Sequence, residues 1–291
     1  MKQCRPKTII VATPGPYGLL GAWWARRIGA KLIVGFHTHF SSVTDVYNNR
    51  LLRAFSRFYF NIADKILFRY GDLVLANSAA MVDLARSLGA RNVGVMGTLL
   101  PSDSLRAPDP PASGKLDRVV FAGRLAPEKR VHTVIDAARQ LPDIRFTIAG
   151  DGPLRKDVER QAASIPNLDY LGWVSRERLL AEMDKADMLV LNSVVESFGT
   201  VALEAMARER LALVSATCGI VDWPDLVDNL YRIEDGESLA DAMRRISALP
   251  AESCAAVARG AREAALRLNR GSLLHWLDVI RSREDSPVAK S

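Results

Sequence analysis

Short apolar runs, rich in β-branched residues, recur along most of the chain and are separated by longer stretches of mixed polarity. Four runs lie in the first hundred residues and five further on, in the order TIIVAT, KLIVGF, DLVLAN and NVGVM, then DRVVFAG, IRFTIAG, NLDYLG, DMLVLN and LALVSA. Continuous apolar character over a few residues is typical of strands whose two faces are both covered by helices. The pattern predicts an α/β fold with two doubly wound parallel sheets.

The stretch between the two sets of strands, Pro101 to Gly114, is rich in Pro, Ser, Asp and Ala, as connections between domains are. A chain of 291 residues is also long enough for two domains that share a cleft. After Pro250 the sequence predicts no strand but two helices that separate near Asn269 to Gly271, followed by a frayed tail after Arg283. The expected parts are a first domain at 1–103, a linker at 104–115, a second domain at 116–250, and C-terminal helices with a tail at 251–291.

Composition and charge narrow the choice of partners. Hydrophobic residues make up 48% of the sequence and charged residues 25%, which is ordinary for a globular protein. The formal charge of +6 and the pI near 9.4 favour anionic partners such as nucleotide diphosphates, acidic lipid head groups or nucleic acid. Because no zinc-finger, RNP or helix-turn-helix pattern accompanies the charge, we expect no nucleic-acid partner.

The cysteines indicate the compartment. Cys4, Cys218 and Cys254 show neither the spacing of a metal site nor the density of a disulfide scaffold, which favours a reducing environment. The apolar run TIIVAT is too short for a signal-peptide core and far shorter than the roughly 20 residues of a membrane span. The sequence therefore predicts a cytoplasmic protein.

Two glycine-containing loops follow strands of the second set. In FAGRLAPEK, Gly123 follows the strand, and Arg124 and Lys129 lie in the loop that opens the next helix, where cations suit a diphosphate. In IAGDGP, Gly150 and Gly152 permit a tight turn and a close approach of the backbone to a ligand. Taken alone, the first loop is equally explained by two solvated charges, and the second is more simply an ordinary strand-to-helix turn.

A pair of glutamates flanks a glycine turn in the segment NSVVESFGTVALEAMA. Glu196 precedes the turn, and Glu204 lies eight residues later, inside the predicted helix. A carboxylate in the crevice at the end of a sheet suits a ribose diol, so we predict a nucleotide site here rather than a packing motif. Backbone N–H groups at the start of the helix, where the dipole favours anions, are offered by Ser197, Phe198 and Gly199.

The order GRLxxEK, GDGP and ExFGxxxxE resembles family 4 of the retaining glycosyltransferases, which have the GT-B fold of two Rossmann-like domains. The resemblance spans most of the chain. It implies that Arg124 and Lys129 bind the donor diphosphate and stabilise the charge of the leaving group in place of a metal. We therefore expect no cofactor and no metal, and retention of configuration without a protein nucleophile.

Further roles follow from the same resemblance. Glu204 would hold the ribose hydroxyls, while Glu196 and the backbone of Phe198 to Thr200 would face the transferred sugar and the phosphates. The backbone of Trp173 and Val174 matches the position that cradles the base. Glu196 is not assigned as a nucleophile or a general base.

The segment from Thr13 to Tyr47, which begins TPGPYGLLG, resembles the middle of the family's acceptor domain. His37 matches a position near the sugar and the acceptor, with a plain structural histidine as the alternative. His37 and His39 are weak evidence for a metal, because no Cys, Asp or Glu stands at ligand spacing. We treat His39, His132 and His275 as structural.

Members of the family usually begin with one or two further βα units, including a glycine-rich loop that faces the donor phosphates. This chain starts after those units, so we expect its first Rossmann-like domain to be shortened. Three explanations remain open: an enzyme completed by a partner chain, a shortened enzyme with an unusual acceptor site, and a truncated protein that binds the donor poorly.

A predicted helix from Asn49 to Tyr70 interleaves apolar and basic residues. Basic amphipathic helices lie on anionic membranes, and with Trp23 and Trp24 nearby in the sequence this favours peripheral contact with the inner face of a membrane. A buried apolar face with its basic side in water explains the pattern equally well. The aromatic residues could instead bind another subunit at an exposed edge of the sheet.

Together these patterns predict a metal-independent retaining glycosyltransferase of the hexosyltransferase type. It would move a sugar from a nucleotide-diphosphate-sugar donor to a lipid-linked or polysaccharide acceptor in cell-envelope or polysaccharide synthesis. The first alternative is a non-catalytic or split-enzyme subunit that binds nucleotide sugar or a partner glycosyltransferase. A weaker alternative is another GT-B activity, such as epimerisation of a nucleotide sugar.

Overall fold

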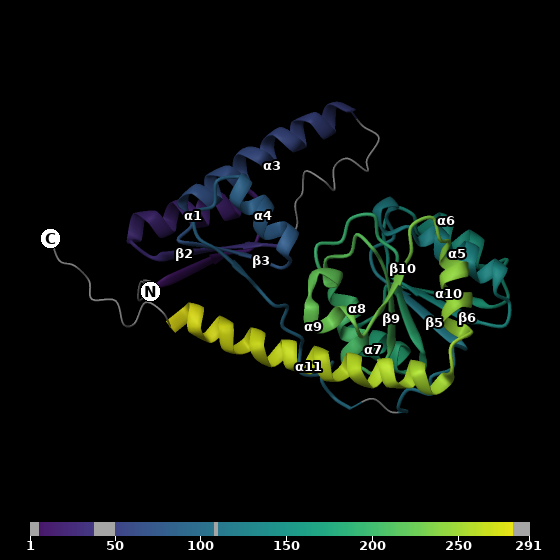
Figure 1. Cartoon of the computed structure of the whole chain (residues 1–291). Helices are drawn as coiled ribbons and strands as arrows, with labels where there is room; N and C mark the ends of the chain where they lie inside the picture. The colour runs from purple at the N-terminus through teal and green to yellow at the C-terminus, as the bar shows by residue number, and fades with distance from the viewer. Residues whose placement is uncertain (1–5, 38–49, 108–109, 282–291) are drawn as a thin grey trace. The chain divides into compact units, whose positions relative to one another are not determined.

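Each of the two predicted sets of strands forms a parallel sheet, and each sheet belongs to its own unit of structure (Figure 1). Unit 1 comprises Met1–Leu99 with Leu268–Ser291, and unit 2 comprises Leu100–Arg267. The structure, a computed structural model, describes residues 6–37, 50–107 and 110–281, without the side chains of residues 50–53. Cys4, His39 and the expected frayed tail after Arg283 lie outside the described residues.

The four runs of the first set form the sheet of unit 1, in the order β1-β2-β3-β4. Every neighbouring pair is parallel. Successive side chains point to opposite faces, and both faces of β2 and β3 are buried, which explains why these runs are continuously apolar. The strands are β1 Thr8–Val11, β2 Lys31–Phe36, β3 Leu73–Ala76 and β4 Val93–Val95.

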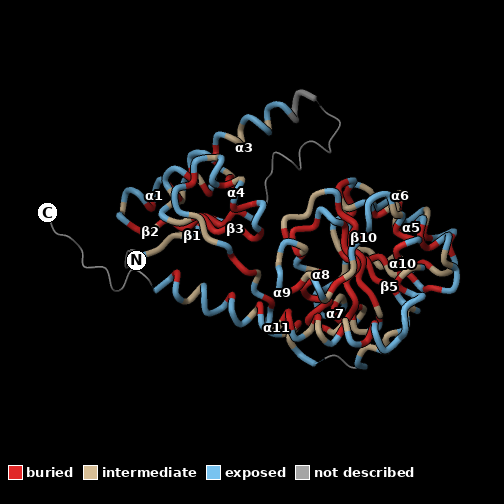
Figure 2. Tube along the Cα trace, in the orientation of Figure 1, coloured by how far each residue is buried: buried red, intermediate tan, exposed pale blue. Residues whose placement is uncertain are grey.

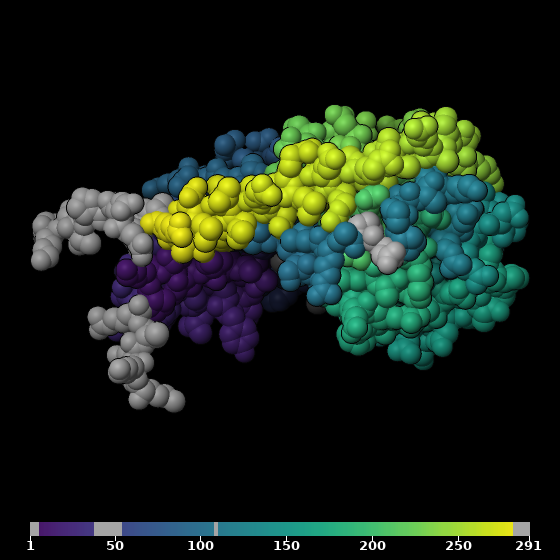
Figure 3. All heavy atoms as spheres, turned by 90° about the horizontal axis from the view of Figure 1, so that it is seen from below, coloured from purple at the N-terminus to yellow at the C-terminus, as the bar shows by residue number. Residues whose placement is uncertain are grey.

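Three helices cover one face of this sheet: α1 (Pro16–Ile28), α3 (Arg50–Tyr70) and α4 (Ala79–Ser87). Ala25 of α1 and Phe68 of α3 belong to the same buried cluster as Leu32, Val34 and Phe36 of β2. On the opposite face, Ile33 and Leu75 form a second cluster with Met96, Trp276 and Val279. The last two residues belong to the final turns of α11 (Ala251–Arg281), which is yellow in Figure 3.

The C-terminal region is this single helix, so the expected break near Asn269 to Gly271 is wrong. An internal glycine costs a helix about 1 kcal/mol relative to alanine. Burial outweighs that cost here, because side chains at helical spacing stay buried across the glycine, namely Ala264, Ala265, Leu268 and Ser272. None of the helices in the described ranges combines the length and the apolar character that a membrane span needs.

Six parallel strands form the sheet of unit 2, in the order β10-β9-β8-β5-β6-β7. Strand order reverses between β5 and β8, which is the kind of switch point where open α/β sheets bind ligands. The five predicted runs are all strands, whereas β10 was missed because it is only three residues long. The strands are β5 Arg118–Ala122, β6 Arg145–Ala149, β7 Leu168–Gly172, β8 Met188–Leu191, β9 Leu211–Ser215 and β10 Tyr231–Ile233.

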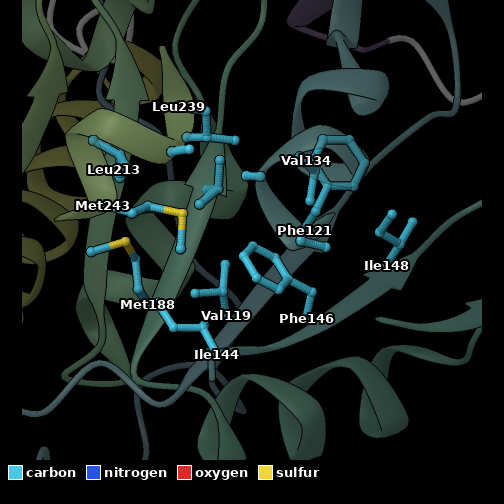
Figure 4. Packing of buried hydrophobic residues seen from close by; sticks show 14 of the residues in the cluster. Val119, Phe121, Val134, Ile144, Phe146, Ile148, Met188, Leu213, Leu239 and Met243 are labelled. Atoms are coloured by element: carbon cyan, nitrogen blue, oxygen red, sulfur yellow. The ribbon is translucent and has the colours of Figure 1, made fainter. Parts of the chain in front are cut away.

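Buried side chains of these strands pack against helices to form the core of unit 2 (Figure 4). Phe121 of β5 and Phe146 of β6 lie in one cluster with Val134 of α5 and Met243 of α10, and the strands appear in red, the colour of buried residues, in Figure 2. This packing holds the carboxyl ends of the strands in place. The remaining elements of unit 2 are η1 Pro127–Lys129, α5 Val131–Gln140, α6 Arg155–Ala162, α7 Arg176–Lys185, α8 Thr200–Ala207, η2 Gly219–Asp222, α9 Pro224–Val227 and α10 Leu239–Ser247.

The boundary between the units differs from the expected linker at 104–115, because unit 2 already begins at Leu100. The stretch has few apolar side chains, so its backbone carbonyls are held by arginines of unit 2 rather than by a core. Arg262 Nη2 donates a hydrogen bond to the carbonyl of Leu105 at 3.1 Å. Arg208 Nη1 donates to the carbonyl of Arg106 at 3.0 Å, and Arg210 Nη2 donates to that of Pro110 at 2.5 Å.

Candidate functional site

The loops that follow β5, β6 and β7 open into a pocket of about 440 Å³ within unit 2. The first turn of α8, which follows the neighbouring strand β8, forms another part of its wall. This is the crevice outside the carboxyl ends of the strands, beside the switch point. Seven residues that the sequence predicted line it: Gly123, Arg124, Gly150, Trp173, Val174, Thr200 and Glu204.

Close packing of backbone joins the loops after β5 and β6. Gly150 has a φ of 147°, and a Cβ built on it would lie 1.9 Å from the carbonyl oxygen of Gly123. Only glycine fits there, so the two loops stay in contact and leave their backbone open to a ligand. Gly152 does not line the pocket; a Cβ built on it would lie 2.5 Å from the carbonyl oxygen of Leu125.

The helix start predicted around the glycine turn is present. Gly199 is the N-cap of α8 with a φ of 94°, and Thr200 is the first residue of the helix. Thr200 and Glu204 are four residues apart and lie on the same side of the helix, which is the side that lines the pocket. Phe198, 2% exposed, packs edge-on against Trp223 with a ring separation of 5.8 Å and anchors the turn. Ser197, Phe198 and Gly199 shape the turn but do not line the pocket.

Glu204 is buried and is held by an arginine that the sequence did not single out. It is 6% exposed, and its Oε1 accepts a hydrogen bond from Arg176 Nη1 at 2.8 Å. Arg176 is the first residue of α7, after the N-cap Ser175. The same guanidinium donates from Nε to Asp103 Oδ2 at 2.8 Å and from Nη2 to Ser104 Oγ at 2.6 Å.

This arrangement joins the pocket to the segment that precedes β5. The hydrogen bonds that Arg176 donates to Asp103 and to Glu204 raise the pKa of Arg176 above its usual value, the one to Asp103 most, so it stays charged. In return, the hydrogen bond from Arg176 lowers the pKa of Asp103. The Glu204 carboxylate is therefore held in one orientation by a cation that is itself anchored outside the pocket.

Lys129 and Glu196 form an ion pair in the turns next to the pocket. Lys129 Nζ lies 2.5 Å from Glu196 Oε2, and the two side chains are 20% and 19% exposed. The sequence placed both residues at the site but did not predict that they bind each other. In this geometry each charge neutralises the other, and a ligand phosphate would have to share the lysine with the glutamate.

Arg124 is the more exposed cation of the site. Its side chain is 57% exposed and lines the pocket, and Nη1 lies 3.9 Å from Oε1 of Glu128, too far for a hydrogen bond. Trp173 and Val174, which come directly after β7, also line the pocket, and Trp173 is 76% exposed. The pocket thus combines a cation, a helix start, a carboxylate and an exposed indole.

Comparison with known proteins shows the family to which the chain belongs. The family model described as "Glycosyl transferases group 1" matches residues 107–264, which is more than half of the chain. The chain belongs to this family. A second model, "Glycosyltransferase Family 4", matches residues 1–96. The two matches together confirm the resemblance to family 4 that the motifs predicted.

Relatives with curated descriptions match parts of the chain. A GDP-mannose-dependent alpha-(1-6)-phosphatidylinositol dimannoside mannosyltransferase of Mycobacterium tuberculosis is 34% identical over 137 residues, which are 45% of this chain and 36% of the relative. The sulfoquinovosyl transferase of Arabidopsis thaliana is 26% identical over 237 residues, 77% of this chain and 44% of the relative. The chain therefore spans less than half the length of these relatives.

Solved structures confirm the GT-B-like fold of the chain. Anabaena HepE in complex with UDP and glucose has a TM-score of 0.70 and 20% identity, covering 92% of this chain and 77% of that one. Sucrose-phosphate synthase of Thermosynechococcus elongatus has a TM-score of 0.76 and 20% identity, covering 95% and 73%. At this identity the likeness concerns the fold.

The predicted residue His37 belongs to unit 1, directly after β2. Partial desolvation of its ring lowers the pKa of His37, although the residue as a whole is exposed. Its carbonyl accepts a hydrogen bond from Asn77 Nδ2 at 3.4 Å. A role for His37 near the acceptor stays a prediction.

Sequence reasoning missed Arg176. It also missed Asp151, Leu179 and Val201, which line the pocket. Arg176 is one of several charged residues in RERLLAEMDK, and its partners lie 28 and 73 residues away along the chain. No local signal could have distinguished it. Among the described residues no three His, Cys, Asp or Glu side chains come together as a metal-binding group.

Proposed function

We propose that the protein transfers a glycosyl group from a nucleotide-diphosphate-sugar donor to an acceptor, with retention of anomeric configuration. One observation carries the proposal: Glu204, Thr200, Arg124 and the backbone of Gly123 and Gly150 surround a single pocket at the carboxyl ends of the central strands. A pocket with a buried carboxylate on one side and cationic and backbone donors on the other suits a nucleoside diphosphate.

The diphosphate would bind where the glycine backbone and the start of α8 offer N–H groups. Arg124 adds an exposed cation, and Lys129, one-fifth exposed beside the turn, adds a second. Positive charge placed where the leaving diphosphate gains negative charge lowers the barrier of the transfer step. We therefore propose that the side chains of Arg124 and Lys129 stabilise the leaving diphosphate in place of a metal ion, and that the reaction proceeds without one.

The two glutamates would have different tasks. Glu204, held by Arg176, presents its carboxylate to the hydroxyls of the ribose. Glu196, paired with Lys129, positions that lysine and faces the transferred sugar. Neither carboxylate is proposed as a nucleophile, so retention would follow from attack on the face that the diphosphate leaves. Trp173 and the backbone of Val174 lie where the base would be held.

The relatives support the substrate class. The description of the mycobacterial enzyme makes it dependent on GDP-mannose and gives it a phosphatidylinositol dimannoside acceptor. The Anabaena structure contains UDP and glucose. We propose a nucleotide-diphosphate hexose as donor and a lipid-linked or polysaccharide acceptor of the cell envelope. Cys218 and Cys254 are buried free thiols, which fits a cytoplasmic site of action.

A second candidate function is a subunit that needs a partner chain for activity. β1 is at one edge of the sheet of unit 1, and Ile10 on it is 48% exposed. An exposed apolar side chain on an edge strand favours pairing with a further strand. We propose that a partner chain would bind along this edge, and that the isolated chain would then bind donor without transferring sugar.

Calorimetry with UDP-, GDP- and ADP-sugars tests the donor site. Glu204→Gln and Lys129→Ala are each expected to weaken binding of the preferred donor by about tenfold or more, since each removes a charged hydrogen-bonding group. Glu237→Gln and Lys185→Ala, which alter ion pairs elsewhere in unit 2, serve as matched controls. Unchanged affinity in both site variants would refute the assignment.

Activity assays test the remaining claims. Transfer should persist in excess EDTA, and NMR of the first-formed product should show the anomeric configuration of the donor. Product formation must depend on the acceptor; conversion of the nucleotide sugar without any acceptor would indicate epimerisation instead. Donor binding without transfer by the isolated chain would favour the subunit.

A further inference from the structure

The helix α3 carries a row of apolar side chains on its outer side. Phe55, Phe58, Ile62 and Ile66 are 69%, 67%, 42% and 38% exposed. Their spacings of three and four residues place them on one side of the helix. The buried side chains of α3, including Leu67 and Phe68, lie on the opposite side and face the sheet. Much of α3 is accordingly pale blue in Figure 2.

The helix α1 repeats this arrangement. Tyr17, Leu20 and Trp24 are 89%, 58% and 47% exposed and are again spaced by three and four residues, while Ala22 and Ala25 pack toward the sheet. α1 and α3 lie side by side on the same face of the sheet (Figure 1). Their two apolar rows therefore share the outer surface of one helix layer.

Direct contacts set the two helices parallel to each other. Just before the start of α1 and in the middle of α3, the Tyr59 hydroxyl donates to the carbonyl of Pro14 at 3.3 Å. Near their end, the guanidinium carbon of Arg26 lies 5.4 Å from the centre of the Tyr70 ring. These contacts align α1 with the second half of α3, so the α1–α3 surface, as we name it, covers both helices there and continues along the first half of α3. It consists of Tyr17, Leu20, Trp24, Phe55, Phe58, Ile62 and Ile66.

Positive charge borders this surface. Arg26 and Arg27 on α1 and Lys65 and Arg69 on α3 are exposed. The sequence of the two helices contains a single acidic residue, Asp64, which is 2% exposed. Apolar and aromatic side chains framed by cations, with no exposed acid in the described part of the two helices, are the pattern of helices that lie in the interface of an anionic membrane.

We propose that the α1–α3 surface docks the protein on an anionic lipid bilayer. Tryptophan and tyrosine favour the boundary between head groups and acyl chains, and long basic side chains reach from an apolar surface to the phosphates. A second copy of the chain is a poorer occupant, because a two-fold dimer through this surface would place its cations opposite one another. The proposal concerns unit 1 and does not depend on the donor site.

Vesicle sedimentation with the full chain tests the proposal. We expect binding to vesicles of phosphatidylcholine with phosphatidylglycerol and at least tenfold weaker binding to phosphatidylcholine alone. Phe55→Ser/Phe58→Ser should lower partitioning into the anionic vesicles by about tenfold or more, since two aromatic side chains no longer leave water. Lys65→Gln/Arg69→Gln should lower it by about fivefold per cation, and only while the vesicles carry anionic lipid.

Matched variants distinguish binding through the α1–α3 surface from nonspecific adsorption to vesicles. Leu274→Ser removes a leucine that is 56% exposed on α11, the helix on the opposite face of the same sheet, and should bind like the unaltered chain. Arg86→Gln/Arg91→Gln removes two exposed cations outside α1 and α3 and should retain most binding. Circular dichroism and thermal unfolding confirm that each variant is folded.

Three results would overturn the proposal. One is absence of binding to anionic vesicles by the unaltered chain. Another is an equal loss of binding in Leu274→Ser and in the double phenylalanine variant. The third is a stable dimer in light scattering that the phenylalanine substitutions dissociate, with no vesicle binding, which would make this surface an interface between copies. Donor affinity should be unchanged in all these variants, so failure here leaves the proposed function untouched.

Discussion

At the scale of single residues, the structure adds Arg176 to the site residues that the sequence predicted. It hydrogen-bonds to Glu204, Asp103 and Ser104, and it stands between the pocket and the segment that leads into β5. A carboxylate in a pocket binds hydroxyls well only when its orientation is held before the ligand arrives. Arg176 is thus a positioning residue for Glu204, and the resemblance assigned no role to it.

Replacing Arg176 tests this role. Arg176→Gln should weaken binding of the preferred nucleoside diphosphate by about tenfold, the scale of a lost charge-assisted hydrogen bond. The loss should be much smaller for the 2′,3′-dideoxy form of the same nucleotide, because that ligand lacks the hydroxyls that Glu204 would hold. Isothermal calorimetry with both ligands makes the comparison.

The control lies on the same helix. Arg178→Gln breaks an ion pair of 2.8 Å with Glu182, one turn further on, and should leave both affinities unchanged. Equal losses for the two ligands in Arg176→Gln would mean that the arginine supports the fold of the pocket and does not position Glu204.

A second residue affects stability rather than binding. Asp64 on α3 is 2% exposed, and Oδ2 has no hydrogen-bond partner among the described residues. Burial raises the pKa of Asp64 from 3.8 to about 7. Between these two values the unfolded chain loses a proton that the folded chain keeps. The contribution of Asp64 therefore lowers the free energy of unfolding as the pH rises from about 4 to about 7.

The variant Asp64→Asn cannot ionise and should lose this part of the pH dependence. At pH 8 we expect it to be more stable than the unaltered chain by roughly 1–2 kcal/mol, since each pKa unit is worth about 1.4 kcal/mol and the amide also lacks a partner. Melting curves between pH 5 and 8.5 measure the difference. Asp83→Asn, at an exposed site, is the control; parallel profiles for all three proteins would contradict the prediction.

At the scale of elements, local patterns were enough for most strands. Each of the nine apolar runs became a strand, because both faces of a parallel sheet are covered and the whole run is apolar. β10 was missed because three residues carry too little pattern. The break predicted in α11 was wrong because it rested on Asn269 and Gly271, whereas burial of neighbouring turns keeps the helix continuous.

The helix α3 shows where a local pattern stops being informative. Its apolar residues were predicted to face either a membrane or the core. The structure divides them, with Leu67 and Phe68 inside and Phe55, Phe58 and Ile62 outside. Because α3 carries apolar residues on two sides, its sequence alone does not say which of them packs against the sheet.

At the scale of the whole molecule, the two units differ in whether their cores come from one continuous stretch of the chain. The core cluster of unit 2 is formed by residues between Val119 and Ala258. Unit 1 depends on both ends of the chain, because Trp276 and Val279 cover Ile33, Leu75 and Met96. The two units should therefore differ in their ability to fold as fragments.

Separate fragments of the chain test this difference in folding. Residues 100–267 alone should fold and melt cooperatively, whereas residues 1–99 alone should be unstable because one face of the sheet is uncovered. Adding a peptide of residues 251–291 should raise the melting temperature of 1–99, in circular dichroism, by binding only the folded form. A 1–99 fragment that is equally stable without the peptide would show that α11 contributes little to unit 1.

The sequence by itself determined the α/β class, the positions of nine strands, the helix start at Gly199 and the family to which the motifs belong. These features depend on apolar runs, glycine turns and short motifs, all of which act between near neighbours in the chain. Only the tertiary structure decided that Arg176 holds Glu204, that Lys129 pairs with Glu196, and which side of α3 faces water. Those outcomes depend on contacts between residues far apart in the sequence, which form only when the sheets bring their ends together.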